Sequence, residues 1–389
     1  MLTLVIDGTD RPALYGAAAA RLAYRDGARF MHLPARFDLA RDPDAAQYVH
    51  ASGGLGPSGL FFAERSLGKT VEPALDLAAI IAAAREENVV VPVHPRFGQS
   101  AEAVAEPARE AGVSVLVVDV PVVDDCLGRG QATAGSDVSI LLVGRERDHR
   151  DVYPAALVSL QDAASQLGLS LAVRFGEPAG LVGPGADDIL AAADGILLPG
   201  GSSMCNVPAQ IAASRHALEN DIPVLGLCLG MQTMATAFAQ RALATEAVNL
   251  AEADPDAPIK SFVAMAALGG EASLPIHRTG NAVGQARSGT KLASLIAGEP
   301  IRFRYNHRYC LAPGLHAKLQ EAGLVISLAS HDDRVVDGIE VPRHPFFWGF
   351  QGHPELGFPA GRPHPVFMAF LSAARERAQL SHSTTTEQN

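Results

Sequence analysis

Residues 224–235, VLGLCLGMQTMA, join an apolar strand pattern to a helical pattern through a cysteine between two glycines. A strand that turns this sharply into a helix presents one side chain above the sheet, and Gly226 and Gly230 stand where a Cβ would crowd the turn. The positive end of the helix would favour the thiolate of Cys228. Taken alone, the stretch fits a nucleophile elbow and a buried structural cysteine equally well.

Short apolar runs alternate with helical patterns along most of the chain, which indicates βαβ units and mostly parallel sheets. Residues 122–136, rich in Gly, Asp, Ser and Thr, interrupt this alternation. We therefore predict an α/β fold with a smaller α/β domain of unknown role over 1–133. An open, mostly parallel sheet flanked by helices is predicted over 137–380, with short strands and loops at 251–300. Residues 381–389 are polar and aperiodic, and we expect a disordered tail.

Composition excludes several classes of protein. The net charge of −11, from 31 basic and 42 acidic residues, argues against a nucleic-acid partner. Four widely spaced cysteines without a CxxC pair argue against a disulfide framework and against a metal site. No apolar run approaches the roughly 20 residues that cross a bilayer, and the N-terminus lacks a signal-peptide pattern. We expect a soluble, cytoplasmic protein with no membrane partner.

A cysteine nucleophile needs a base, and the base needs a group that orients it. Residues 346–356, FFWGFQGHPEL, place His353 after an apolar, aromatic run and Glu355 two residues later. In extended backbone these two side chains project to the same side, so that Glu355 can support the imidazole. A single histidine is usually structural, but an elbow cysteine followed by His-Pro-Glu at a strand end favours a catalytic set.

The two motifs GLCLGMQ and GHPE resemble the signatures of class I glutamine amidotransferases, and the match within that family is to the glutaminase domain of CTP synthase. The resemblance covers roughly 137–377. Further similar blocks are ADGILLPGGSSMCNVPAQIAASRHALENDIPVLGLCLGMQ (193–232), DPDAPI (254–259), RYNHRY (304–309) and GRPHPVF (361–367). Because so many blocks occur in the same order as in the family, the resemblance is not a coincidence.

The resemblance implies a Cys-His-Glu triad of Cys228, His353 and Glu355 that forms and hydrolyses a γ-glutamyl thioester. It also implies an oxyanion hole from the backbone N–H groups of Gly201 and Leu229, each donor being worth about 3 kcal/mol.

The substrate contacts that the resemblance implies come from three further side chains. Gln232 would face the pocket, Glu252 would hold the α-ammonium group of glutamine, and Arg308 would grip its α-carboxylate.

The sequence departs from this family at two places. The family's RHRHRY stretch reads RYNHRY here, with Tyr305 and Asn306 as replacements, which puts contacts with a synthetase neighbour in doubt. The turn after PGG reads SSMCN, which puts gating of the oxyanion loop in doubt. Cys205 and Cys310 are predicted to be small packing residues.

The first 136 residues are too few for the amidoligase domain of CTP synthase, so CTP synthesis is not expected. Neither SGGLGPSG (52–59) nor SLGKT (66–70) fits the P-loop pattern, so no cofactor is evident and ATP would act only through a partner or an unrecognised site. His94, Arg96 and Asp119 follow or end predicted strands, where an open α/β sheet binds ligands, although such residues are often only structural.

These observations lead to three hypotheses. The first is an amidotransferase that hydrolyses L-glutamine and passes ammonia to an unknown acceptor, held by the N-terminal domain or by a synthetase partner. The second is a γ-glutamyl hydrolase without ammonia transfer. The third is a regulatory protein that binds glutamine or a nucleotide without catalysis, which the intact set of site residues argues against.

Overall fold

The computed structural model describes residues 1–48, 60–120, 135–201, 203–268, 274–330, 332–356 and 361–386. The chain divides into two compact units. The N-terminal unit comprises Met1–Arg129 and Arg147–Val158, and the C-terminal unit comprises Gly130–Glu146 and Ser159–Asn389. The interruption predicted at 122–136 lies largely outside the described residues.

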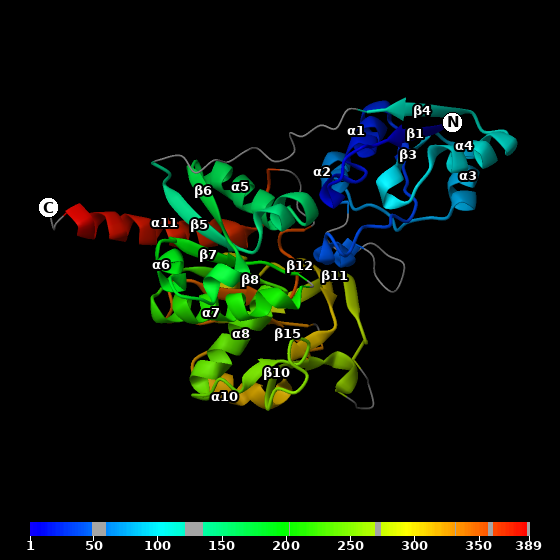
Figure 1. Cartoon of the computed structure of the whole chain (residues 1–389). Coiled ribbons are helices and arrows are strands. Elements are labelled where there is room, and N and C mark those ends of the chain that lie inside the picture. The colour runs from blue at the N-terminus through cyan, green and yellow to red at the C-terminus, as the bar shows by residue number, and fades with distance from the viewer. Residues whose placement is uncertain are drawn as a thin grey trace. The chain divides into compact units, whose positions relative to one another are not determined.

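The N-terminal unit is built on a four-stranded parallel sheet with the order β2-β3-β1-β4 (Figure 1). Its strands are β1 (Leu2–Ile6), β2 (Arg29–Phe30), β3 (Val89–Val93) and β4 (Val115–Asp119). Its helices are α1 (Ala17–Asp26), α2 (Phe61–Leu67), α3 (Leu77–Glu86) and α4 (Ala101–Glu110), with 3₁₀ turns η1 (Pro12–Leu14), η2 (Pro43–Tyr48) and η3 (Pro95–Phe97).

Helices cover both faces of this sheet, as the alternation of strands and helices predicted. On one face, apolar residues of α1 and α2 pack with Val5 and Val90. On the other face, residues of α3 and α4 pack with Leu4 and Val91. Because neighbouring side chains of a buried strand point to opposite faces, the run VVVPV is apolar throughout and LTLVI is apolar except for Thr3.

The segment Arg147–Val158 packs with the N-terminal unit although it follows the first strand of the C-terminal sheet. Val152 and Tyr153 join the apolar core beside α1. Arg147 pairs with the buried carboxylate of Asp42. The prediction placed this segment in the C-terminal domain. A local sequence pattern does not reveal contacts with residues that are distant in the sequence.

The C-terminal unit is built on a nine-stranded sheet with the order β12-β11-β14-β15-β16-β8-β7-β5-β6. The five strands from β16 to β6 are parallel, and the strands from β12 to β16 pair antiparallel. The nine strands are β5 (Val138–Val143), β6 (Leu171–Gly176), β7 (Gly195–Leu198), β8 (Val224–Leu227), β11 (Arg278–Ala286), β12 (Ile301–His307), β14 (Val325–Ala329), β15 (Val336–Glu340) and β16 (Phe347–Phe350). A second, three-stranded sheet contains β9 (Val248–Leu250), β10 (Ile259–Ala264) and β13 (Tyr309–Leu311).

Helices flank the parallel part of this sheet, which confirms the predicted fold class. The helices are α5 (Ala155–Leu167), α6 (Ala186–Ala191), α7 (Val207–Glu219), α8 (Leu229–Ala242), α9 (Lys291–Leu295), α10 (His316–Glu321) and α11 (Pro365–Thr386). The short elements of this unit are the 3₁₀ turns η5 (Pro178–Leu181), η6 (Met204–Asn206), η7 (Met265–Ala267) and η8 (Pro313–Leu315). The π-helical turn η4 (Asp148–Val152) belongs to the N-terminal unit.

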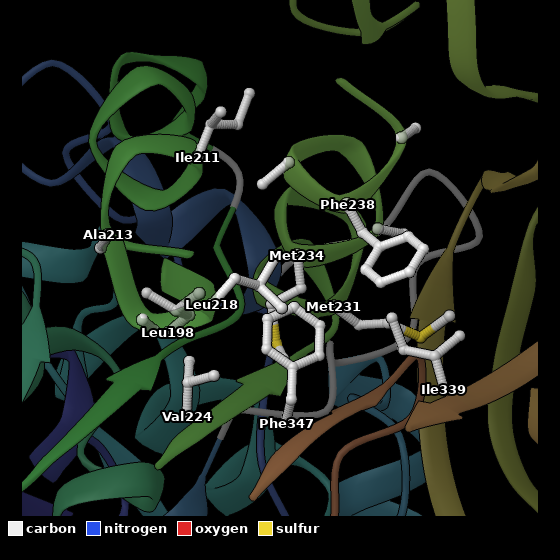
Figure 2. Close-up of a cluster of buried hydrophobic side chains, with 14 of the residues drawn as sticks. Leu198, Ile211, Ala213, Leu218, Val224, Met231, Met234, Phe238, Ile339 and Phe347 are labelled. Carbon is white, nitrogen blue, oxygen red and sulfur yellow. The ribbon is translucent and has the colours of Figure 1, made fainter. Parts of the chain in front are cut away.

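The main core lies between α7, α8 and the sheet. Figure 2 shows Met231 and Met234 of α8 beside Val224, Ile339 and Phe347 from the strands. All five residues are almost fully buried. This packing fixes α8 against the strand that precedes it, and so fixes the turn between them.

Helix α11 continues to Thr386, past Ser381, where the disordered tail was predicted to begin. The run after Pro365 contains neither glycine nor a further proline, so nothing in the local sequence ends the helix early. Within the described residues, no helix is long and apolar enough to cross a bilayer.

Candidate active site

Cys228 occupies a sharp turn between β8 and α8. Its backbone has φ 49° and ψ −103°, a conformation that costs a non-glycine residue about 1–3 kcal/mol. Its N–H donates to the carbonyl of Phe350 at 2.7 Å, and its carbonyl accepts from the N–H of Gln232 at 3.2 Å. The residue is only 8% exposed. The turn has the backbone geometry of a nucleophile elbow.

Glycine is required at both flanking positions, because α8 lies very close to β7 and β8 there. A Cβ on Gly230 would lie 2.1 Å from the carbonyl oxygen of Leu198, and a Cβ on Gly226 would lie 2.3 Å from Sδ of Met234. Such distances are far inside van der Waals contact. The glycine spacing seen in the sequence therefore reflects how tightly α8 lies against β7 and β8.

We expect Gly230→Ala to lower the free energy of unfolding of the C-terminal unit by about 3 kcal/mol, the upper end of the usual cost of overpacking. The clash is with backbone, which cannot move aside as a flexible side chain can. Thermal unfolding followed by circular dichroism measures this loss. Gly314→Ala is the matched control, because a Cβ there meets nothing within 4 Å. Equal melting temperatures for the two variants would contradict the close-packing explanation.

His353 and Glu355 form a buried pair just beyond β16. Nδ1 of His353 lies 2.7 Å from Oε1 of Glu355, and both side chains are less than a tenth exposed. The His353 N–H donates to the carbonyl of Arg304 at 2.8 Å, which anchors the pair to β12. Nε2 of His353 and Oε2 of Glu355 have no hydrogen-bond partner among the described residues. The nitrogen that would carry a proton to a substrate is therefore left available.

The charges around His353 decide its protonation. Burial lowers the pKa of the imidazole, but the charges of Glu355 and Cys228 and the hydrogen bond to Glu355 outweigh it and raise the pKa to about 10. The imidazolium is thus the favoured form at neutral pH. A positive ring beside Cys228 is the counter-ion that a thiolate nucleophile uses.

Gln351 is a site residue that the sequence reasoning missed. Its Nε2 lies 3.6 Å from Sγ of Cys228, and its Oε1 accepts from Nε2 of Gln232 at 3.3 Å. Gln351 is fully buried and Gln232 is 3% exposed. The signal in the sequence was its position two residues before His353.

The PGG turn after β7 lies against the reacting pair. A Cβ on Gly200 would lie 3.0 Å from Cε1 of His353 and 3.3 Å from Cβ of Cys228. Gly201 follows directly, and Leu229 is the buried first residue of α8. Both predicted oxyanion donors thus belong to segments next to Cys228. Gly200 is a further position that the sequence reasoning did not single out.

The prediction for the two other described cysteines is half right. Cys310 is buried in the small core beside Met265, and burial raises the pKa of its thiol to about 11. Cys205 was predicted to be a packing residue, but its side chain is exposed, with Sγ 2.9 Å from Oγ of Ser203. It lies in the short turn η6, where its Sγ also lies 3.7 Å from Oδ1 of Asn206.

Glu252 and Arg308 lie close to each other on loops at the small sheet. Desolvation raises the pKa of the Glu252 carboxyl, and the charge of Arg308 opposes that rise. Both residues are exposed, and within the described part of the chain no direct ion pair joins them. Arg308 is linked to the cysteine through β12, since the carbonyl oxygen of Asn306 lies 3.9 Å from Sγ of Cys228.

The departures in RYNHRY have a structural explanation. Tyr305 is fully buried, and its hydroxyl donates to Asp337 at 3.1 Å while the guanidinium of Arg278 lies 3.7 Å from its ring centre. Arg278 also binds both carboxylate oxygens of Asp337. Asn306 accepts through Oδ1 from His277 at 2.7 Å. Tyr305 thus links β12 to its neighbour β11 and to β15, two strands further along the sheet, and Asn306 links it to the residue before β11.

A metal site has no support in the arrangement of side chains. Among residues placed by the structure, no group of three or more His, Cys, Asp or Glu side chains could hold an ion.

The comparisons with known proteins agree with this geometry. Residues 177–373 match the family model for glutamine amidotransferase class-I. CTP synthase of Acidobacterium capsulatum is 34% identical over 252 residues, which are 64% of this chain and 45% of that protein. CTP synthase of Thermobifida fusca is 34% identical over 275 residues, 68% of this chain and 50% of that protein. The chain thus spans about half the length of these relatives.

A solved structure extends the likeness to the fold. The CTPS glutaminase domain of Trypanosoma brucei, determined with bound acivicin, has a TM-score of 0.57 and 26% identity. The match covers 61% of this chain and 94% of that domain.

A strained cysteine turn, a buried histidine–carboxylate pair and an open α/β sheet define an amidotransferase-type domain. The chain belongs to the class I glutamine amidotransferase family and is related to the glutaminase domain of CTP synthase.

Proposed function

We propose that this chain hydrolyses L-glutamine with Cys228 as nucleophile and delivers the ammonia to an acceptor. One observation carries the proposal: Cys228 stands on a strained elbow beside the buried pair of His353 and Glu355, whose Nδ1–Oε1 distance is 2.7 Å. Glu355 fixes the ring so that Nδ1 is occupied and Nε2 is left for proton transfer.

In the first step, Sγ of Cys228 attacks the side-chain amide carbon of glutamine and the carbonyl oxygen becomes an oxyanion. The backbone N–H groups of Gly201 and Leu229 would bind that oxyanion, each donor contributing about 3 kcal/mol. The imidazolium of His353 then gives its proton to the leaving nitrogen, and ammonia departs. The product on the enzyme is a γ-glutamyl thioester.

In the second step, water enters the site that ammonia has left. The water oxygen attacks the thioester carbon, and His353, now neutral, accepts a proton from that water. Collapse of the intermediate breaks the bond to Sγ and releases glutamate, and the imidazolium–thiolate pair is restored. Glutamine and water are thereby converted to glutamate and ammonia.

The charged end of the substrate would be held by the neighbouring groups Glu252 and Arg308, the first for the α-ammonium and the second for the α-carboxylate. Gln232 supports a substrate contact because its buried Oε1 has no hydrogen-bond partner among the described residues. Such an atom is costly to bury unless a ligand or water satisfies it.

Arg308→Leu is expected to raise the KM for glutamine by about 10–100-fold with little change in kcat, since a hydrogen bond to a charged group contributes about 1.5–3 kcal/mol. Steady-state glutamate release measures both constants. Arg302→Leu, at another exposed arginine, which lies on the preceding strand β12, is the matched control. An unchanged KM in the Arg308 variant would remove that residue from the glutamine site.

The ammonia acceptor is proposed to bind to the N-terminal unit or to a synthetase partner. The acceptor needs an electrophilic carbon, and if that carbon must be activated by ATP, a partner or a site not yet recognised would supply the nucleotide. CTP synthesis by this chain alone is not part of the proposal. The cytoplasmic location inferred from the sequence stays a prediction.

The direct test is to incubate the purified chain with glutamine carrying a ¹⁵N-labelled side-chain amide and to follow glutamate and labelled ammonia. Release of both in equal amounts supports the proposal, and transfer of the label to an added acceptor would extend it. Cleavage of γ-glutamyl anilides faster than glutamine would favour the γ-glutamyl hydrolase. Absence of turnover, together with tight glutamine binding, would favour a regulatory protein.

A further inference from the structure

Gln351 connects Cys228 to Gln232 through its side-chain amide. It follows β16 directly, its backbone N–H donates to the carbonyl of Asp337 at 2.9 Å, and its side chain is fully buried. The amide nitrogen Nε2 donates to Sγ of Cys228 at 3.6 Å, and the amide oxygen Oε1 accepts from Nε2 of Gln232 at 3.3 Å. Both ends of this amide are therefore engaged inside the protein.

The sulfur of Cys228 determines which way round the Gln351 amide lies. A thiolate carries no proton and can only accept, so the NH₂ group of the amide has to face it. In the neutral form, the thiol proton has the carbonyl of Asn306 at 3.9 Å to donate to, and a sulfur lone pair again faces Gln351. A reversed amide would set its carbonyl oxygen against the sulfur in both forms. The oxygen Oε1 is therefore directed away from Cys228 in either charge state.

The same constraint passes to Gln232, which lies one helical turn beyond the cysteine in α8. Its backbone is fixed, because its N–H donates to the carbonyl of Cys228 at 3.2 Å and its carbonyl accepts from Oγ1 of Thr236 at 2.8 Å. Since Oε1 of Gln351 can only accept, Gln232 has to present its NH₂ group there. The oxygen of the Gln232 amide is buried and has no hydrogen-bond partner in the part of the chain that the structure describes.

This buried oxygen is the atom that Gln232 offers to a ligand. A buried acceptor without a partner is costly unless a ligand or a water supplies a donor. If both amides were reversed, Gln232 would offer an NH₂ group in the same place and would select an oxygen of the ligand. The order of the two amides therefore sets the kind of group that binds beside Gln232.

We propose that Gln351 is a positioning residue with two linked effects. Its NH₂ group stabilises the thiolate of Cys228, and its oxygen holds the amide of Gln232 with Oε1 toward the substrate. The group that the substrate brings to Gln232 is then an N–H donor. The effect on the substrate rests on the proposed function, whereas the effect on the thiolate does not.

The effect on the thiolate is tested by alkylation of Cys228 with iodoacetamide from about pH 5 to pH 10, followed by mass spectrometry of the peptide that contains it. Gln351→Met keeps the length of the side chain and removes both hydrogen bonds. We expect the midpoint of the alkylation profile to rise by about one pH unit or more, the usual effect of losing a hydrogen bond to a charged acceptor. His353, with Glu355 behind it, is common to both proteins, so the difference between the two profiles reports on Gln351.

Gln240→Met is the matched control for a lost buried amide. Gln240 also lies on α8, and its Nε2 donates to the carbonyl of Val248 at 2.9 Å while its Oε1 accepts from Arg215 at 2.8 Å. An unchanged midpoint in Gln351→Met, or an equal rise in both variants, would overturn the proposal. If Gln351→Met does not fold, Gln351→Asn takes its place, because its amide is one methylene too short to reach both partners and the same rise is expected.

The effect on Gln232 is tested by glutamate release. Gln351→Met should raise the KM for glutamine about threefold to tenfold, since Oε1 of Gln232 is no longer held toward the substrate. Gln232→Met should raise the KM as well but leave the alkylation midpoint in place, because Gln351 still donates to the sulfur. A midpoint that rises equally in Gln232→Met would overturn the proposed order of the amides. Absence of glutamate release from the wild type, with the midpoint still raised in Gln351→Met, would refute the proposed function and support the role of Gln351 at the thiolate.

Discussion

Cys228→Ala is expected to lower kcat for glutamine hydrolysis by about 10⁴-fold or more, because no other group can form the thioester. Removal of the nucleophile from a comparable catalytic set costs this much or more, and only binding and the oxyanion donors remain. The fold should survive, since alanine keeps the Cβ and the side chain removed is a single sulfur. Glutamate release under saturating glutamine measures the loss.

Cys310→Ala provides the matched control. Cys310 is also buried, but its thiol has a pKa raised to about 11 by desolvation, so it stays protonated at pH 8 and is a poor nucleophile. We expect this variant to keep its glutaminase activity. A glutamine analogue that carries a thiol-reactive electrophile should label the wild type and Cys310→Ala, and should leave Cys228→Ala unlabelled. Equal activity of the two alanine variants would exclude Cys228 as the nucleophile.

The elbow could be predicted because its determinants are local. One glycine stands two residues before the cysteine and another two residues after it, between a strand pattern and a helix pattern. These glycines allow the close approach of α8 to β7 and β8 that the structure contains. The pair of His353 and Glu355 could be predicted because the two residues lie only two positions apart, although the backbone that joins them is a turn and not the extended segment that we expected. In both cases the residues that determine the feature lie within a few consecutive positions of the sequence.

The features of the fold and the site that the sequence did not predict depend on contacts between segments that are distant along the chain. Gln351 joins the site only because β16 lies beside β8, and Tyr305 departs from the family pattern because Asp337 and Arg278 lie on strands beyond its own. The packing of Arg147–Val158 with the N-terminal unit is a third case. Periodicity identifies the elements but not their neighbours, so these features needed the structure.

Glu355→Gln is expected to lower kcat by about 10³–10⁴-fold, comparable to the loss when a triad carboxylate becomes an amide and no longer fixes the ring tautomer. It should also change how stability depends on pH. The pKa of His353 is raised from 6.5 to about 10 against the effect of burial, and Glu355 is the leading cause of the rise. Without that charge the rise in the pKa of His353 is smaller, because the charge of Cys228 then opposes the effect of burial without help from Glu355.

A raised histidine pKa stabilises the fold fully below the unfolded value and loses that contribution as pH rises through the folded value. Wild type should therefore exceed Glu355→Gln in melting temperature by more at pH 7 than at pH 10, because at its folded pKa of about 10 the wild-type imidazolium has already lost about half of its proton occupancy. All other titrating groups are common to the two proteins and cancel in the difference. A difference that is constant from pH 7 to 10 would show that Glu355 positions the ring without holding its charge.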